Sequence, residues 1–200
     1  MTLAAVKRLV KETPLCKISE AREGLMAVKG RARALKKIQS PLLGVNVVAY
    51  QIYCRAVTNS GRRLELSFAR ANNFVVEDGT GSIEVVSYNA YLMLKHEYQT
   101  SSGSADSFSF DVLRALRKEC DADLTHVRMD SFEWNAYFLE EREPCYVVGD
   151  CRLVVDTEQT AIHYRESARK PTLRAPKESP LVVSEFDRVE LEQRLSGYFQ

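Results

Sequence analysis

The residue types that most often carry out chemistry are sparse in this sequence, and their spacing fits no common reaction. His96, His126 and His163 are far apart, and none lies in an HExxH pattern or beside a marked nucleophile. The motifs GxSxG, GxxxxGK[ST] and GxGxxG are absent. The tetrapeptide Asp78-Gly79-Thr80-Gly81 differs from the Asp-Thr-Gly of aspartic proteases by an inserted glycine, and it lacks the acid spacing of an EF-hand. We therefore expect a protein that is not an enzyme and that uses no cofactor or metal.

The cysteines predict neither a zinc site nor a disulfide framework. There are five: Cys16, Cys54, Cys120, Cys145 and Cys151. Their number is odd, no two form CxxC, and no histidine stands at zinc-finger spacing. Cys145 and Cys151 would face each other if their segment formed a hairpin, but buried free thiols are the favoured interpretation.

Basic and aromatic side chains suggest a different chemistry, which is the binding of a charged chain. We define a basic edge as the cations on or just after one predicted strand: Lys29, Arg31, Arg33, Lys36 and Lys37. Aromatic residues that could stack on nucleic-acid bases follow in the sequence: Tyr50, Tyr53, Phe68 and Tyr88. Aromatic residues more often fill cores, and the sequence pI of about 7.6 is below that of a dedicated nucleic-acid binder.

The net charge of +1 conceals an uneven distribution along the chain. Residues 1–63 contain 13 basic and 3 acidic residues, whereas residues 64–200 contain 15 basic and 24 acidic residues. Such a division is typical of a basic binding face or of two halves that neutralise each other. We favour partial neutralisation within the fold, since it requires no outside partner.

The elements that must position these side chains are mainly strands. Residues 25–35 alternate, so that Lys29, Arg31 and Arg33 share one face. Further strands are predicted over 47–57, 63–70, 74–77 and 82–88, and residues 145–155 resemble a hairpin-like segment with a bend or a bulge at Gly149-Asp150. Residues 134–143 fit a helix or a strand equally well. Apolar spacing predicts helices over 2–12 and within an insertion near 100–122.

Asp78-Gly79-Thr80-Gly81 lies between two predicted strands and is therefore interpreted as a hairpin corner. Gly79 and Gly81 permit a positive φ, and Asp78 and Thr80 can accept hydrogen bonds from turn amides. This interpretation is favoured over a ligand site.

The order of elements predicts a mainly β protein. We expect a small OB-like, curved β-barrel of five or more strands with accessory N- and C-terminal helices and a helical insertion. The expected organisation is an N-terminal helix over 1–14, the barrel domain over 15–166 with its insertion near 100–122, and a linker with a C-terminal helix over 167–200. Ser184 and Asp187 have capping-box-like spacing before that helix.

Four segments in order resemble the GIDE domain, also called the BAM (beside-a-membrane) domain. They are ISEAREGLMAVKGRARAL, SPLLGVNVVAYQIYCRAV, NNFVVEDGTGSIEVVSYNAYL and EEREPCYVVGDCRL. The family motif falls on Gly24, Val28, Gly30, Ser40, Pro41, Leu42, Gly44, Phe74, Asp78, Gly79, Thr80, Gly81, Glu141, Arg142, Glu143, Tyr146, Val147 and Gly149. The resemblance covers about residues 12–155. This family includes mitochondrial RING ubiquitin ligases and bacterial relatives that lack the RING.

The resemblance implies a module that recognises a substrate or a protein partner and does not catalyse. The sequence departs from the family because it shows no flanking transmembrane helix and no RING, so ubiquitin transfer is not expected. We expect binding through a barrel face or a strand edge, with the basic edge attracting an acidic protein partner. One alternative is an OB-like single-stranded nucleic-acid-binding protein, in which Tyr50 and Tyr53 stack on bases. Another is an adaptor attached peripherally to a membrane by the basic helix over 2–12. The expected location is the cytoplasm, including positions close to a membrane.

Overall fold

The computed structural model describes residues 3–41, 44–100, 114, 116–118, 120, 126, 133–155 and 169–197 of the 200-residue chain. Leu42 of the family motif, His163 and most of the predicted insertion lie outside the described residues.

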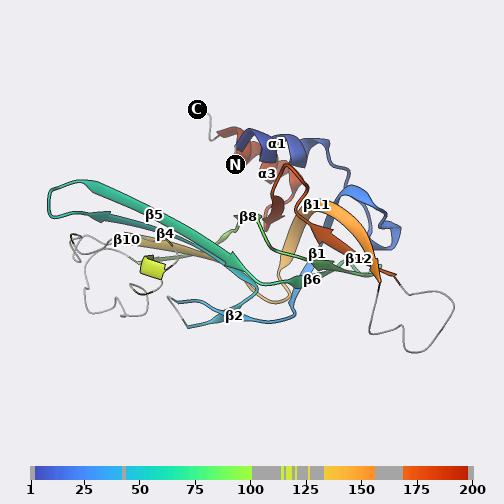
Figure 1. Ribbon diagram of the computed structural model, residues 1–200, viewed down its shortest axis with the longest axis horizontal. Coiled ribbons are helices and arrows are strands. Elements are labelled where there is room, and N and C mark those ends of the chain that lie inside the picture. The colour runs from blue at the N-terminus through green and yellow to red at the C-terminus, as the bar shows by residue number, and fades with distance from the viewer. Residues whose placement is uncertain are drawn as a thin grey trace.

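One half of the molecule contains a closed barrel of five strands (Figure 1). The strands are β1 (Gly24–Ala34), β6 (Phe74–Glu77), β7 (Ser82–Val85), β12 (Arg169–Arg174) and β11 (Pro144–Val155). They are hydrogen-bonded in this order, and β11 pairs with β1 to close the ring. The pairing of β7 with β12 is parallel, and the other four are antiparallel. The predicted fold class, a mainly β, OB-like barrel, is confirmed.

Strand β11 is long enough to hold three neighbours. One edge pairs with β1, while the other pairs first with β13 (Leu181–Ser184) and then with β12. The change of neighbour falls at Gly149, where a Cβ atom would lie 2.6 Å from Leu181 Cδ1 and 2.7 Å from the Arg174 oxygen. The predicted hairpin over 145–155 is therefore wrong. Glycine is required at position 149 because β12 and β13 both approach the same edge of β11 there. The chain does not bend back at this point.

The segment predicted as a linker after residue 166 contains two strands, β12 and β13. Strand β12 completes the barrel, and β13 joins β11 to β8 (Ala90–Met93) at the end of the seven-stranded sheet. Pro171 and the neighbouring cations conceal β12 in the sequence, because proline and charge are uncommon in strands. Its signal is the inward-facing Leu173, which is fully buried.

The barrel core is formed by side chains that alternate inward along these strands. Phe74, Val76, Val85 and Val147 are fully buried in it. Gly30 lies where β1 approaches β6 most closely, since a Cβ atom there would be 2.4 Å from the Glu77 oxygen. Two of the glycines in the family motif thus serve strand packing.

A second, four-stranded sheet projects from the barrel (Figure 1). Its order is β5 (Arg63–Ala71), β4 (Ala49–Val57), β10 (Glu133–Leu139) and β9 (His96–Thr100), and all its pairings are antiparallel. Residues 134–139, ambiguous in the sequence, form a strand because Trp134, Ala136 and Phe138 alternate into the core.

One face of this second sheet is buried in a core of its own. Tyr50, Ile52, Phe68 and Phe138 pack there with Leu116 of the insertion. The described residues 114, 116–118 and 120 are helical, as predicted for the insertion.

A two-stranded ribbon connects β1 to the second sheet. It consists of β2 (Ile38–Gln39) and β3 (Asn46–Val47), which pair antiparallel. Gly44 has a φ of +66°, and its amide donates to the Ser40 oxygen at 2.9 Å, while Pro41 is half-buried.

The terminal helices cover the outside of the barrel. Helix α1 (Leu3–Glu12) buries Val6, Leu9 and Val10 in a third cluster, together with Leu191 and Leu195 of α3 (Arg188–Gly197). Both predicted terminal helices are confirmed. None of the helices in the described part of the chain has the length and apolar character needed to span a membrane.

Candidate functional site

The second sheet has one face that does not enter its core. Along β4, the buried Tyr50, Ile52 and Cys54 alternate with residues on the opposite face, which are Gln51, Tyr53 and Arg55. The register places Asn135 of β10 opposite Tyr53 and Tyr137 opposite Gln51. A polar and aromatic surface therefore follows from the period of two in each strand.

The tyrosines on this face form a defined pair. The rings of Tyr53 and Tyr137 meet edge to face, with centroids 5.8 Å apart. Gln51 Nε2 donates to Tyr53 Oη at 2.5 Å. Tyr53 remains 43% exposed, so its ring can contact a ligand. Edge-to-face pairs are favourable beyond the area they bury, and this favours the observed arrangement of the two rings.

Opposite this face lies the edge of β8. Four consecutive residues of this segment, Tyr91, Leu92, Met93 and Leu94, border the same space as the tyrosine pair. Consecutive side chains of a strand point to opposite faces, so a space that meets four of them in sequence lies along the strand's edge.

The end of the cleft is formed by α3 and the residue that precedes its cap. The Arg194 guanidinium lies over the Phe186 ring, with Cζ 3.9 Å from the ring centroid. Lys95 Nζ is 4.8 Å from the same centroid. Both distances are within the range of a cation–π interaction, which holds the exposed Arg194 side chain in place.

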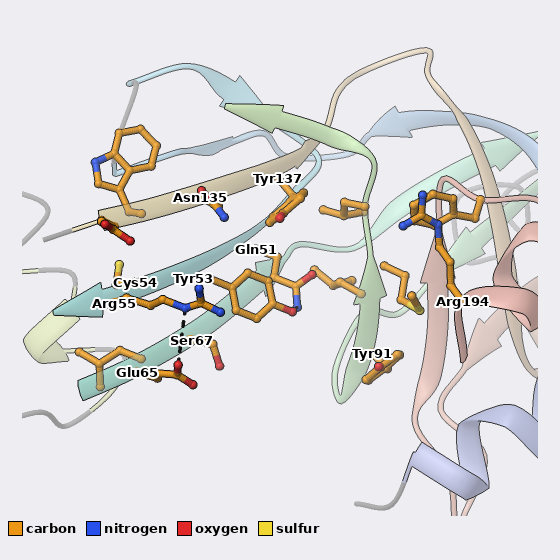
Figure 2. A pocket seen from close by; sticks show the side chains of 17 residues that line it. Gln51, Tyr53, Cys54, Arg55, Glu65, Ser67, Tyr91, Asn135, Tyr137 and Arg194 are labelled. Carbon is orange, nitrogen blue, oxygen red and sulfur yellow. Dashed lines mark hydrogen bonds and ion pairs between the residues drawn. The ribbon is translucent and has the colours of Figure 1, made fainter. Parts of the chain in front are cut away.

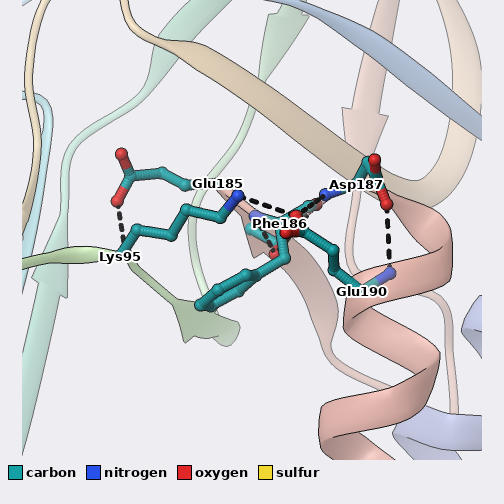
Figure 3. A network of polar contacts seen from close by, with 6 residues as sticks. Lys95, Glu185, Phe186, Asp187 and Glu190 are labelled. Carbon is teal, nitrogen blue, oxygen red and sulfur yellow. Dashed lines mark hydrogen bonds and ion pairs between the residues drawn. The ribbon is translucent and has the colours of Figure 1, made fainter.

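A polar network holds α3 against β8 (Figure 3). Lys95 Nζ forms an ion pair with Glu190 Oε2 at 2.7 Å, and the Lys95 amide donates to Glu185 Oε2 at 2.7 Å. The Glu190 amide donates to Asp187 Oδ1 at 3.0 Å, and the Asp187 amide donates to Glu190 Oε2 at 3.4 Å. The capping box is therefore Asp187 with Glu190, and the prediction that pairs Ser184 with Asp187 is wrong, because Ser184 lies at the end of β13.

Hydrogen bonds within this network stabilise the ionised carboxylates of Asp187 and Glu190. The amide of Glu190 lowers the pKa of Asp187, and the hydrogen bond from Lys95 lowers the pKa of Glu190. Both carboxyl groups are therefore ionised at neutral pH, and the ion pair with Lys95 is present.

Together these three walls enclose a cleft of about 660 Å³, which we call the intersheet cleft. Figure 2 shows Gln51, Tyr53 and Tyr137 on one side of it and Tyr91 and Arg194 on the other. Its volume falls within the ~300–1,000 Å³ range of ligand pockets. Its polar groups are amides, hydroxyls, the guanidinium groups of Arg55 and Arg194, and the carboxylates of Glu65 and Glu133, a set that suits recognition.

The basic edge lies elsewhere. Lys29, Arg31 and Arg33 are exposed along β1, as the alternation predicts, and Lys36 and Lys37 follow it on the surface. Lys29 and Arg31 border a second, shallow hollow with the residues of the β6–β7 turn. The structure therefore does not bring the basic edge and Tyr53 into one site.

Much of the basic edge is already occupied by other parts of the chain. Arg33 Nε lies 2.7 Å from Glu77 Oε1, and Lys37 Nζ lies 2.6 Å from Glu141 Oε2. Arg31 donates to the Arg142 oxygen at 2.9 Å. These contacts join the basic N-terminal part of the chain to its acidic remainder, and they agree with partial neutralisation within the fold.

The aromatic residues considered as a base-stacking platform are divided between core and surface. Tyr50 is 3% exposed and meets Phe68 edge to face inside the second sheet's core. The proposed stacking role of Tyr50 is therefore wrong, because its ring is not accessible. Tyr53 and Tyr88 are exposed, but only Tyr53 borders the intersheet cleft.

Asp78-Gly79-Thr80-Gly81 forms the predicted hairpin corner between β6 and β7. Asp78 Oδ1 accepts from the Thr80 amide at 2.8 Å and the Gly81 amide at 3.1 Å, and Oδ2 accepts from the Ile18 amide at 2.8 Å. Gly79 has a φ of +82°, as predicted. Gly81 does not share it. Glycine is needed at this position because the turn packs closely against Ile18, whose Cγ2 would be 3.1 Å from an added Cβ atom.

This corner attaches the barrel to the short helix η1 (Ile18–Glu20). Thr80 Oγ1 accepts from the Ser19 amide at 3.2 Å, which adds to the bond between Asp78 and Ile18. Partial burial raises the pKa of Asp78, but the hydrogen bonds from Ile18, Thr80 and Gly81 outweigh it and lower the pKa overall. Both carboxylate oxygens of Asp78 and the Thr80 hydroxyl oxygen accept hydrogen bonds from the protein's own backbone, which supports a structural role for this corner.

The cysteines are all free thiols. Cys145 and Cys151 lie on the same strand, β11, and so do not face each other across a hairpin. Burial raises the pKa of Cys54 and of Cys145 to about 12. Both thiols are therefore protonated at neutral pH and unsuited to nucleophilic attack.

Within the described ranges, no three His, Cys, Asp or Glu side chains gather in a way that would hold a metal ion. The side chains that border the intersheet cleft are suited to hydrogen bonding, stacking and ion pairing. No family model, curated protein or solved structure matches this chain.

Several residues of the cleft are not predicted from the sequence. Gln51 and Asn135 are polar positions within predicted or ambiguous β segments, and strict alternation would have placed them on one face. Phe186 and Arg194 give no comparable signal, because their position depends on how α3 packs against the barrel.

Proposed function

We propose that this protein is a non-catalytic binding module that recognises a protein partner, in the manner that its resemblance to the GIDE domain implies. The observation that carries the proposal is the intersheet cleft, whose walls are a sheet face, a strand edge and a helix held together by an ion-pair network. Strand edges and aromatic surfaces of this kind are recurrent means of peptide and protein recognition.

The proposal is tested by affinity purification of the tagged full chain from its native cell, followed by mass spectrometry. We expect one or more proteins to be enriched reproducibly and to bind the purified chain directly in isothermal titration calorimetry. Absence of direct binding for every enriched protein would contradict the proposal.

A second candidate function is single-stranded nucleic-acid binding, which is favoured by one observation, the edge-to-face pair that the exposed Tyr53 forms with the half-buried Tyr137. Two features weigh against it. None of the cations of the basic edge borders the intersheet cleft, and two of them, Lys29 and Arg31, border a different hollow. Glu65 and Glu133 do border the cleft, where they would repel phosphates.

This second candidate is tested by the fluorescence anisotropy of a labelled single-stranded oligonucleotide at low salt. Salt-sensitive binding that is lost in Tyr53→Ala, and retained in a Tyr88→Ala control, would support it. A flat titration at low salt would exclude it.

Attachment to a membrane through α1 has less support. The apolar side chains that would enter a bilayer, Val6, Leu9 and Val10, are buried against α3 and the barrel. Insertion would require α1 to leave this packing.

A further inference from the structure

We infer that the intersheet cleft binds an extended peptide that carries a carboxylate. The peptide backbone would be added as a strand to the edge of β8 that no described strand occupies, and the carboxylate would be held by Arg194. The inference rests on the proposed function, because it assigns the recognised segment of the partner to one site and to one chemistry.

Strand β8 ends the seven-stranded sheet. It pairs with β13 on one side, and no described strand pairs with its other side. The Leu181 amide donates to the Asn89 oxygen at 3.2 Å, and the Glu185 amide donates to the Met93 oxygen at 3.1 Å. Both acceptors face β13, so the ladder uses alternate residues of β8.

By this alternation the backbone groups of residues 89, 91 and 93 face β13. The backbone of Leu92, which lies between Tyr91 and Met93, therefore points the other way, and its N–H and C=O are directed at the intersheet cleft. The Leu92 side chain is buried in the barrel core, which leaves its backbone to meet a ligand. A strand edge with an available donor and acceptor is the requirement for strand addition.

The opposite wall suits a peptide in this position. The side chains of an added strand would alternate, and one set would face the second sheet. There Tyr53 and Tyr137 provide aromatic surface, and Gln51 and Asn135 provide amides that can donate and accept.

We infer that the peptide carries a carboxylate because of the arginines that border the cleft. Of the described cations that border the cleft, Arg55 has Glu65 as its partner at 3.5 Å. Arg194 has no carboxylate within ion-pair distance among the described residues, and its guanidinium is held over Phe186. A fixed guanidinium of this kind binds a carboxylate with two parallel hydrogen bonds.

The same charges disfavour a nucleic acid. Glu65 and Glu133 border the cleft, and a chain with a phosphate at every residue would be repelled along it. A peptide with a single carboxylate placed at Arg194 meets no such repulsion.

The experiment uses the purified full chain and a phage-displayed library of random linear peptides. We expect selection to enrich peptides with a shared acidic position, and synthetic copies of them to bind in calorimetry. Arg194→Gln should weaken binding about 10- to 100-fold, the effect of losing a charged hydrogen-bond partner. Arg194→Glu should weaken it further. The matched control is Arg22→Glu, an exposed arginine outside the cleft, which should bind as the wild type does.

Hydrogen exchange of single amides provides a second measurement that does not depend on variants. Peptide binding should slow exchange of the Leu92 amide, because the added strand accepts its hydrogen bond. The Met93 amide, which faces β13, should change little and is the internal control.

Three outcomes would overturn the inference. The first is that selected peptides bind Arg194→Glu as well as the wild type and leave Leu92 exchange unchanged. The second is that no peptide is enriched. The third is that a second copy of the chain, or a single-stranded oligonucleotide, slows Leu92 exchange in place of a peptide. A partner that binds directly in affinity purification, yet binds Arg194→Glu equally well, would leave the proposed function standing and remove only the cleft from it.

Discussion

The carboxylate of Asp78 forms its hydrogen bonds with other groups of the same protein. Its carboxylate accepts from the amides of Ile18, Thr80 and Gly81 and from the Thr80 hydroxyl. The local part of this arrangement can be predicted from the sequence, because aspartate and glycine are turn-forming residues. The bond to Ile18 cannot be predicted, because it joins residues 60 positions apart. The same limit applies to Arg194, whose contact with Phe186 requires the geometry of α3.

We expect Asp78→Ala to lower the free energy of unfolding by about 1–3 kcal/mol, because several amides lose their acceptor. Asp78→Asn should cost less, since its remaining oxygen can still accept from Thr80 and Gly81. Urea denaturation at neutral pH measures both. Equal stability of the two variants and the wild type would contradict this role.

The same carboxyl group predicts a pH dependence. Its pKa in the folded protein lies below the ordinary value of 3.8, so the stabilisation is present above that value and is lost as pH falls through the lowered folded-state pKa. The difference in unfolding free energy between wild type and Asp78→Asn should be constant from neutral pH down to about pH 5 and should shrink below about pH 4. Denaturation curves across this range would show a constant difference if the carboxylate has no role.

At the scale of elements, β11 organises the barrel because it changes neighbours along one edge. The strands with β-branched and aromatic residues, including β4, β6 and β7, are predicted from the sequence within a few residues. Strand β12 is not, because Pro171 and its cations resemble a linker. The bend predicted at Gly149 fails for a related reason. A glycine in a strand indicates either a bend or a close approach, and only the position of Leu181 distinguishes them.

We expect Gly149→Ala to destabilise the protein by about 1–3 kcal/mol, because the new methyl group would overlap Leu181 and the Arg174 oxygen. The matched control is Gly197→Ala, where a Cβ atom meets nothing within 4 Å. That change should be neutral or stabilising by up to about 1 kcal/mol. Thermal or urea denaturation compares the two variants, and equal effects would argue against the close approach.

At the scale of the whole molecule, the arrangement of the two sheets creates the intersheet cleft. Its residues come from β4, β8, β10 and α3, which are distant in the sequence. The sequence predicts the strands and their exposed faces, but the cleft depends on how one sheet projects from the other. The basic edge is correctly predicted as exposed, yet its separation from Tyr53 also follows only from the packing of the sheets.

The packing of α1 gives a prediction for the full chain. Because its apolar face is buried with Leu191 and Leu195, the folded protein should remain in the supernatant when anionic liposomes are sedimented. A tagged amphipathic helix known to bind the same liposomes is the positive control. Co-sedimentation of the full chain, with faster exchange of the α1 amides, would show that α1 leaves the barrel and would restore the membrane alternative.

The closure of the barrel by β1 and β11 also has a consequence during synthesis. Gly24 pairs with Cys151 and Arg31 pairs with Pro144, so the ring joins an early part of the chain to a late one. At roughly 5–20 residues per second, on the order of ten seconds separate the emergence of these strands from the ribosome. During that interval β1 lacks the partner that covers one of its edges. A nascent chain halted before β11 cannot close its barrel, and the uncovered edge of β1 is where we expect chaperones to bind during translation.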